Sequence, residues 1–132
     1  MMLTTHSPWS LTPLRILLAD DSVVHQKVAT ALLQKQGHTV TITSNGKEAV
    51  EALESQNFDL VLMDVEMPVM NGLEATTAIR QRESWQGGHI PVVAVTSIPD
   101  VARCFAAGMD AHLPKPLQAE ALHLTMQRFT PR

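Results

Sequence analysis

Short runs of apolar residues alternate along the chain with longer amphipathic segments. The most continuous run is Leu60–Met63, four apolar residues in a row, and the acid Asp64 follows it directly. A run this short is typical of a strand that is buried on both faces of a sheet. The turn-forming pairs Met67-Pro68 and Asn71-Gly72 come next. We therefore predict that Asp64 lies at the carboxyl end of a buried strand.

The same pattern predicts four further strands and five helices. The other strands are expected at Ile16–Ala19, Thr39–Thr43, Pro91–Val95 and Ala111–Leu113. Helices are expected between the strands and after the last one. N-cap residues or a following Gly mark the first four, and apolar spacing marks the last. Their expected extents are Ser22 to Gln36, Gly46 through Leu53, Leu73 to Arg82, Pro99 to Gly108, and Gln118 to Phe129.

Apolar spacing also predicts which side chains pack inward. In the first helix the expected face is Val24, Val28 and Leu32, and in the second strand it is Val40 and Ile42. The second helix is expected to pack through Ala49, Val50 and Leu53, and the last through Ala121, Leu122, Met126 and Phe129. The segment Glu83–His89, which contains Gly87-Gly88, is expected to be a polar surface loop.

Strand and helix alternate five times with short connections. Such alternation predicts an α/β fold with a parallel sheet and helices on both faces, because each crossover has to be right-handed. The order of the strands does not follow from the pattern. With 132 residues the chain makes one domain. We expect residues 1–13 to be a flexible lead-in or linker and residues 14–130 to form the domain.

Composition excludes several classes of function. The net charge is −3 and no block of Lys and Arg occurs, which argues against direct binding of nucleic acid. The single cysteine, Cys104, cannot form an internal disulfide and is expected to pack in the core. No apolar run approaches 18 residues and no signal-peptide pattern is present, so no direct membrane contact is expected. We expect a cytoplasmic domain, whose parent protein could be membrane-anchored.

Functional side chains follow four of the five predicted strands. Asp20 and Asp21 follow the first strand, Asp64 the third, Thr96 the fourth, and Lys115 comes just after the fifth. A parallel sheet brings these ends to one edge, where ligands bind in open α/β folds. Each acid alone could simply cap a helix. Three acids at one edge repel by several kcal/mol per pair at an effective dielectric of about 20, and so require a cation.

The chemistry of these side chains favours a phosphoryl site. Oxygen ligands suit Mg²⁺, and no set of Cys and His has zinc spacing. Opposite a metal-bound carboxylate, Lys115 would neutralise phosphoryl oxygens and Thr96 would donate a hydrogen bond. One carboxylate would then be the nucleophile and form an acyl phosphate.

Several short motifs in a fixed order carry a resemblance to a known family. The chain resembles the receiver domains of two-component response regulators, most of all those attached to hybrid sensor histidine kinases. The resemblance extends over about residues 14–129. The motifs are Ile16–Asp21 (ILLADD), Asn45–Ala49 (NGKEA), Asp59–Pro68 (DLVLMDVEMP), Asn71–Ala75 (NGLEA), Ala94–Ser97 (AVTS), Gly108–Asp110 (GMD) and Leu113–Pro116 (LPKP).

The resemblance implies a role for each residue that matches these motifs. Asp64 would be the phosphoacceptor, and Mg²⁺ would be held by Asp20, Asp21, Asp64 and the backbone carbonyl of Glu66. Lys115 would contact the phosphate, and its peptide bond to Pro116 is usually cis in the family. Thr96 would be the switch hydroxyl.

The family also implies a fold, a partner and an output. The expected fold is a flavodoxin-like, five-stranded doubly wound sheet of order 2-1-3-4-5 with five helices. The partner would be a histidine kinase or a histidine phosphotransfer domain. Output, including a possible homodimer, would use the face formed by the fourth helix, the fifth strand and the last helix. As a stand-alone domain the chain would catalyse only its own phosphorylation and dephosphorylation.

Three departures from the family pattern leave alternatives open. His112 stands where an aromatic switch residue is usual, and it is either a plain surface histidine or a weak or pH-sensitive switch. Between Thr96 and Gly108 the chain is shorter than usual by about three residues, close to one helical turn. Glu66, two residues after the phosphoacceptor, is expected to influence the rate of dephosphorylation.

Two other functions compete with a switching receiver. The first is a pseudo-receiver, an interaction module in which the short fourth helix and His112 mark a loss of switching. The second is a metal-dependent phosphatase with an aspartyl-phosphate intermediate, whose usual second acid Glu66 matches only loosely. Four other histidines, His25, His38, His89 and His123, lack ligand spacing and are expected at the surface or half-buried.

Overall fold

A computed structural model describes residues 12–97 and 100–130 of the chain. Five strands alternate with five helices, as predicted. The predicted lead-in falls almost entirely outside the described residues, and its boundary with the domain stays a prediction. The elements are β1 (Arg15–Ala19), α1 (Val23–Lys35), β2 (Thr39–Thr43), α2 (Gly46–Ser55), β3 (Leu60–Asp64), α3 (Gly72–Gln86), β4 (Val92–Thr96), α4 (Val101–Ala106), β5 (Ala111–Pro114) and α5 (Ala119–Phe129).

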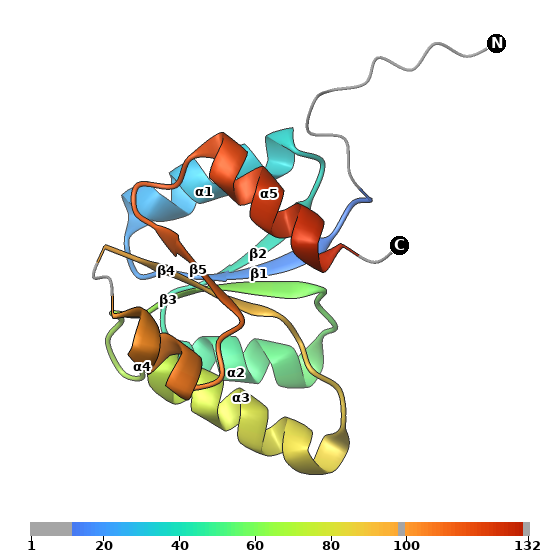
Figure 1. The fold of residues 1–132 in the computed structure, drawn as a ribbon, viewed down its shortest axis with the longest axis vertical. Helices are drawn as coiled ribbons and strands as arrows, with labels where there is room; N and C mark the ends of the chain where they lie inside the picture. Colours follow the sequence, from blue (N-terminus) through green and yellow to red (C-terminus); the bar gives the residue numbers. More distant parts are fainter. Residues whose placement is uncertain (1–11, 98–99, 131–132) are drawn as a thin grey trace, which may run out of the picture.

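The strands form one parallel sheet in the order β2-β1-β3-β4-β5, which confirms the predicted fold. Helices α1 and α5 cover one face of the sheet, and α2, α3 and α4 cover the other (Figure 1). The core is accordingly divided into two hydrophobic clusters, one on each face. All five residues of β3 are buried, because this strand is central and covered on both sides.

Helix caps hold the elements that lead away from the carboxyl ends of the strands. The Ser22 and Asn45 side chains cap α1 and α2. Asn71 and Glu74 form a reciprocal capping box at the start of α3. Gly72, the first residue of α3, packs so closely on β3 that a Cβ atom there would lie 2.1 Å from the backbone oxygen of Asp64. The start of α3 is therefore held tightly against the end of β3.

Two predictions of inward-facing residues are wrong. In α1 the buried residues are Ala29 and Leu33, whereas Val24 and Val28 are 68% and 45% exposed. In β2, which is an edge strand, Ile42 is 44% exposed. The apolar residues at the start of α1 therefore contribute to the surface instead of the core.

Helix α3 continues four residues beyond its predicted end at Arg82, so the first half of the predicted surface loop is helical. Side-chain pairs on the helix surface support this extra turn. Arg80 forms an ion pair with Glu83, and Arg82 hydrogen-bonds Gln86. Gly87, with φ +84°, ends the helix.

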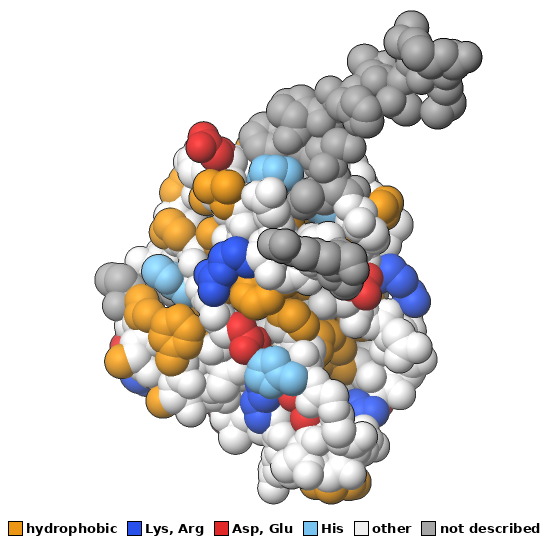
Figure 2. Space-filling view, turned by 45° about the vertical axis from the view of Figure 1, so that its right-hand side comes forward, with side chains coloured by type: hydrophobic (Ala, Val, Ile, Leu, Met, Phe, Trp, Pro, Cys, Tyr) orange, Lys and Arg blue, Asp and Glu red, His pale blue; other side chains and the backbone are white. Residues whose placement is uncertain are grey.

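An ionic cluster and a cavity lie at the edge where the strands begin. The carboxylate of Asp110 contacts Arg80 at 2.7 Å, His89 at 2.6 Å and the backbone N–H of Val92 at 2.9 Å. A cavity of about 430 Å³ at this edge is lined by residues that include Phe58, Ile79 and His89. Figure 2 is turned toward this side and shows hydrophobic side chains between charged ones. None of the predicted site residues lines this cavity.

His38 is buried, whereas a surface or half-buried position was predicted. It is 3% exposed, and its Nδ1 accepts a hydrogen bond of 3.0 Å from the backbone N–H of Leu14. The protein environment lowers the pKa of His38, chiefly through burial and secondly through repulsion by His123.

No helix in the described part of the chain combines the length and the apolarity needed to cross a bilayer.

Candidate functional site

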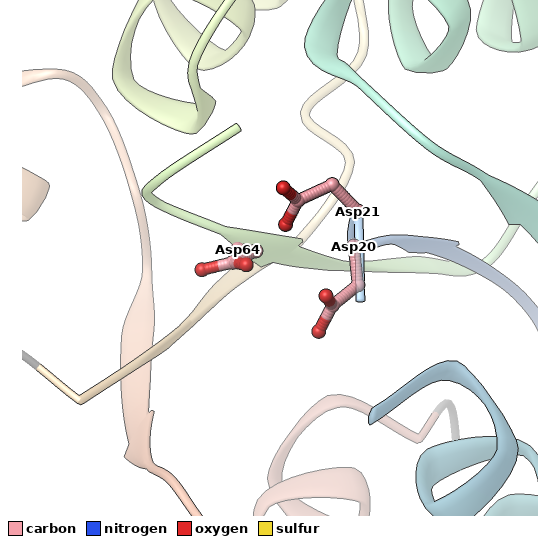
Figure 3. Close-up of side chains that lie close together, drawn as sticks. All are labelled: Asp20, Asp21 and Asp64. Carbon is pink, nitrogen blue, oxygen red and sulfur yellow. The ribbon is translucent and has the colours of Figure 1, made fainter. Parts of the chain in front are cut away.

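Three acidic residues meet at the carboxyl edge of the sheet. Asp20 and Asp21 follow β1, and Asp64 is the last residue of the neighbouring strand β3. One carboxylate oxygen from each lies within 4.8 Å of the others. Figure 3 shows the three side chains close together, with Asp64 at the end of β3 and Asp20 and Asp21 after β1. Asp20 and Asp64 are buried, and Asp21 is exposed. The predicted acidic cluster is thus present.

Lys115 reaches the cluster from the segment after β5. Its ammonium nitrogen lies 2.9 Å from Asp64 Oδ2 and 3.5 Å from Asp20 Oδ2. The peptide bond between Lys115 and Pro116 is cis, as predicted from the family resemblance. The backbone N–H of Lys115 also donates to the carbonyl of Thr96, which ties the segment to the end of β4. The lysine therefore lies between two of the three acids.

The carboxyl of Asp64 is in an unfavourable place for a negative charge. Burial raises the pKa of Asp64 above its usual value, and repulsion by Asp20 raises it further. The hydrogen bond and the charge of Lys115 oppose this rise, as does the backbone N–H of Glu66, 3.3 Å from Asp64 Oδ1. A further cation at the cluster would therefore stabilise the ionised form of Asp64.

Asp20 is fixed through its backbone as well as its side chain. Its N–H donates to the carbonyl of Thr43, and its Oδ1 accepts from the N–H of Ser22 at 2.9 Å. Its own carbonyl accepts a 2.6 Å hydrogen bond from Nε2 of Gln26. His25 Nδ1 lies 3.8 Å from Asp20 Oδ2. No sequence signal distinguishes Gln26 or His25, because amphipathic helices commonly carry such polar residues.

The remaining predicted site residues are close to this edge. Thr96 is buried at the end of β4, one residue beyond Val95, which pairs with Asp64 in the sheet. His112 is half-buried in β5 and pairs with Ala94, two residues before the end of that strand pair. Glu66 is exposed in the loop after β3. All three residues thus lie at or near the carboxyl ends of the strands.

The acidic cluster has the chemistry of a site for a hard divalent cation. Its donors are carboxylate oxygens alone, and one of the three acids is open to solvent, so water could complete the coordination. Magnesium binds in this manner, through a few carboxylates and several waters. The residues present therefore fit a cation such as Mg²⁺, which Asp20, Asp21 and Asp64 would hold.

An apolar cavity lies directly beside the acids. It has a volume of about 250 Å³, and its lining includes Val24, Val28 and Leu117 together with Asp20 and Lys115. Val23, also at the start of α1, is exposed as well. The wrongly predicted face of α1 thus forms an apolar surface next to the charged site.

Comparison with known proteins gives one consistent family. Residues 16–127 match the family model of the response regulator receiver domain. Hybrid signal transduction histidine kinase I of Dictyostelium discoideum is 39% identical over 121 residues, a match that covers 86% of this chain and 7% of that protein. Histidine kinase 1 of Arabidopsis thaliana is 37% identical over 157 residues, covering 92% and 13%. The chain thus spans only a small part of these curated relatives.

Two solved structures share the fold of this chain. The receiver domain of sensor histidine kinase PA1611 from Pseudomonas aeruginosa PAO1, with a magnesium ion in its active-site cleft, is 36% identical with a TM-score of 0.81. That match covers 89% of this chain and 98% of the other. The receiver domain of Ssk1, in complex with the histidine phosphotransfer protein Ypd1 of Saccharomyces cerevisiae, is 25% identical with a TM-score of 0.84 and 89% coverage of both chains.

Proposed function

The chain belongs to the response regulator receiver domain family, and on this basis we propose that it is the phosphoacceptor of a two-component phosphorelay. In this proposal Asp64 takes a phosphoryl group from a phosphohistidine on a partner protein. The observation that carries the proposal is the contact of Lys115 Nζ with Asp64 Oδ2 at 2.9 Å, within an acidic cluster. A nucleophilic carboxylate, a fixed ammonium group and a cation site therefore lie together.

The proposed reaction is a direct transfer between two side chains. An oxygen of the ionised Asp64 carboxylate attacks phosphorus, so that a P–O bond forms and the P–N bond of the phosphohistidine breaks. The imidazole nitrogen keeps the bonding electron pair, and the imidazole, protonated on its other nitrogen, leaves as a neutral group. Lys115 lies where its ammonium can contact the phosphoryl oxygens, and Thr96 at the end of β4 would donate its hydroxyl to one of them.

The proposal includes a magnesium ion held by Asp20, Asp21 and Asp64, with the backbone carbonyl of Glu66 as a further ligand. When bound, Mg²⁺ supplies neutralisation of negative charge on the phosphoryl oxygens. The chain itself prepares the site, because the hydrogen bonds to the backbone and the carboxylate of Asp20 fix that ligand before a cation binds. The proposed ligand role of Glu66 follows from the family resemblance.

The partner would be a histidine kinase or a histidine phosphotransfer domain. The Ypd1–Ssk1 complex supports this proposal, because a receiver of the same fold binds a phosphotransfer protein there. The exposed valines and the apolar cavity beside Asp20 provide a surface that such a partner could cover while its histidine approaches Asp64. The similarity to hybrid kinases supports a cytoplasmic domain with a larger parent, which need not contact nucleic acid or membrane itself.

Phosphorylation would act as a switch. The phosphoryl group adds a charge of roughly −1.5 to −2, which shifts a two-state equilibrium only if it binds one state better. We propose that Thr96 and His112 couple the site to the face formed by α4, β5 and α5. An output partner, or a second copy of the chain in a homodimer, would bind at this face. Helix α4 has only 6 residues, the feature that favours the competing pseudo-receiver function.

Treatment with a small-molecule phosphodonor and Mg²⁺ tests the proposal. Phosphate-sensitive gel migration should show one modified species of the wild type and none of Asp64→Asn. Asp59→Asn is a matched control, because Asp59 precedes the same strand and is exposed. Equal modification of Asp64→Asn, or an unmodified wild type, contradicts the phosphoacceptor function. A modified protein whose α4, β5 and α5 resonances do not shift is a pseudo-receiver, and multiple turnover on phosphate esters indicates a phosphatase.

A further inference from the structure

Gln26 connects helix α1 to the loop that carries two of the three acids. Its side-chain nitrogen donates a 2.6 Å hydrogen bond to the backbone carbonyl of Asp20, six residues earlier. The same nitrogen lies 3.5 Å from the hydroxyl of Ser44, in the loop after β2. The backbone of Gln26 is itself fixed within α1, where its N–H donates to the carbonyl of Ser22. The side chain therefore links helix α1 to the loop that contains Asp20 and Asp21.

The carbonyl that Gln26 binds belongs to the peptide unit between Asp20 and Asp21. A peptide unit is planar, so fixing its oxygen also fixes the direction in which the following residue leaves. Among the described residues, the exposed carboxylate of Asp21 has no hydrogen-bond partner, whereas that of Asp20 is held by Ser22 and Lys115. The position of the Asp21 carboxylate thus depends on its backbone, which Gln26 restrains on one side and the Ser22 N–H, bound to the Asp20 carboxylate, restrains on the other.

We propose that Gln26 is a positioning residue for the cation site, which raises affinity for Mg²⁺ by holding Asp21 in line with Asp20 and Asp64. The inference rests on the proposed function, because it assumes that these three acids bind the cation. It adds a residue that contacts neither the cation nor the phosphoryl group. A flexible Asp21 would have to be ordered each time a cation binds, and that cost would lower affinity.

The test is a Mg²⁺ titration followed by amide resonances of Asp20, Asp21 and Asp64. Gln26→Met keeps the length and the helix propensity of the side chain but cannot donate a hydrogen bond. Gln26→Asn keeps the amide but is shorter by one methylene and should not reach the carbonyl. Both should weaken Mg²⁺ binding by roughly threefold to tenfold, the equivalent of one neutral hydrogen bond.

Gln34→Met is the matched control, since Gln34 is exposed on the same helix. It should bind Mg²⁺ as the wild type does. Thermal unfolding in EDTA separates a positioning role from a structural one. If Gln26 positions the cation site, its substitution should reduce the free energy of Mg²⁺ binding by more than it reduces the free energy of unfolding. Equal Mg²⁺ affinity of wild type and both Gln26 variants overturns the inference and leaves the phosphoacceptor function intact. Absence of Mg²⁺ binding by the wild type overturns both.

Discussion

Lys115 and Asp64, 51 residues apart in the chain, are joined by a hydrogen bond of 2.9 Å from ammonium to carboxylate. The lysine side chain is only 13% exposed, and its nitrogen also lies 3.5 Å from Asp20. One cation therefore balances two buried acids as long as no metal is bound. Because like charges at this distance repel, the metal-free site depends on Lys115 for its stability.

Replacement of Lys115 by methionine should destabilise the metal-free protein and increase its dependence on Mg²⁺. We expect a loss of roughly 1.5–3 kcal/mol in EDTA, the range for hydrogen bonds to charged groups. Because the acids then lack a counter-charge, saturating MgCl₂ should raise the Tm of Lys115→Met more than that of the wild type. Lys47→Met, at an exposed lysine of α2, is the control for thermal unfolding. A Mg²⁺-induced rise no larger than that of the wild type would contradict this account.

Asp64→Asn should stabilise the metal-free protein at neutral pH. The folded protein raises the pKa of Asp64, mainly by burial, so the stability linked to its protonated form is present at acid pH and lost as pH rises through the folded pKa. The neutral amide avoids this loss, and we expect a gain of roughly 0.5–2 kcal/mol at pH 7. The advantage should shrink as the pH is lowered. Urea unfolding in EDTA at several pH values measures it, and a variant less stable at every pH would refute the prediction.

The sequence pattern predicted the sheet and the acidic edge because both depend on local signals. The apolar run of β3 ends at Asp64, and the Asn71 cap follows at a fixed spacing. The buried face of α1 was predicted wrongly, because Val24 and Val28 share the helical period of the buried Ala29 and Leu33 on a neighbouring stripe. Periodicity shows that a helix has an apolar side but not which of two adjacent stripes meets the sheet.

The contact of Lys115 with Asp64 was expected because both residues follow strands that end at one edge of the sheet, but the contacts of Arg80 and Gln26 had no such signal. Arg80 reaches Asp110, 30 residues away, and Gln26 reaches a backbone carbonyl in the loop after β1. Such contacts depend on the distance between packed elements, which no local pattern encodes. His38 illustrates the same limit, because its burial results from the packing around Leu14 and not from its sequence neighbours.

Gly72→Ala should damage both the fold and the cation site. The added Cβ would lie 2.1 Å from the backbone oxygen of Asp64 and 2.9 Å from Cγ of Met63, so the start of α3 or the end of β3 has to move. We expect a loss of about 2 kcal/mol or more and a weaker response of Tm to Mg²⁺.

Gly88→Ala is the control for the glycine substitution. Gly88 has φ +86°, but a Cβ added there would meet no atom within 4 Å. The cost of this substitution is therefore one of backbone strain, roughly 1–2 kcal/mol. The control should lose stability and keep the Mg²⁺ response. A Mg²⁺ response of Gly72→Ala equal to that of Gly88→Ala would show that the close packing at Gly72 does not position Asp64.

Asp110→Asn should reduce stability without affecting the site. The substitution removes the charge that pairs with Arg80 and His89 at the opposite edge of the sheet, at an expected cost of about 1–3 kcal/mol. Because none of these residues contacts the acidic cluster, Mg²⁺ affinity should not change. Glu51→Gln, at an exposed acid of α2, is the matched control. A changed Mg²⁺ affinity in Asp110→Asn, measured by the amide titration, would reveal coupling between the two edges.

His38 should make the protein less stable in mild acid. Its Nδ1 accepts the Leu14 N–H, so the neutral ring carries its proton on Nε2, and a second proton has to displace that hydrogen bond. Burial and the neighbouring His123 lower the pKa of His38 below the ordinary value of 6.5. The stability linked to the neutral ring is thus complete above pH 6.5 and is lost as pH falls toward the folded pKa.

Substitution of His38 by asparagine tests this pH dependence. The Asn Oδ1 is placed much as Nδ1 is and can accept from Leu14, but it does not titrate. The urea midpoint of the wild type should fall between about pH 7.5 and pH 5.5, while that of His38→Asn should fall less. Gln34→Met, at an exposed residue of α1 that does not titrate, should keep the wild-type slope. Because the buried ring has to lose its Leu14 contact when it is protonated, an equal slope in wild type and His38→Asn would place the acid sensitivity elsewhere in the protein.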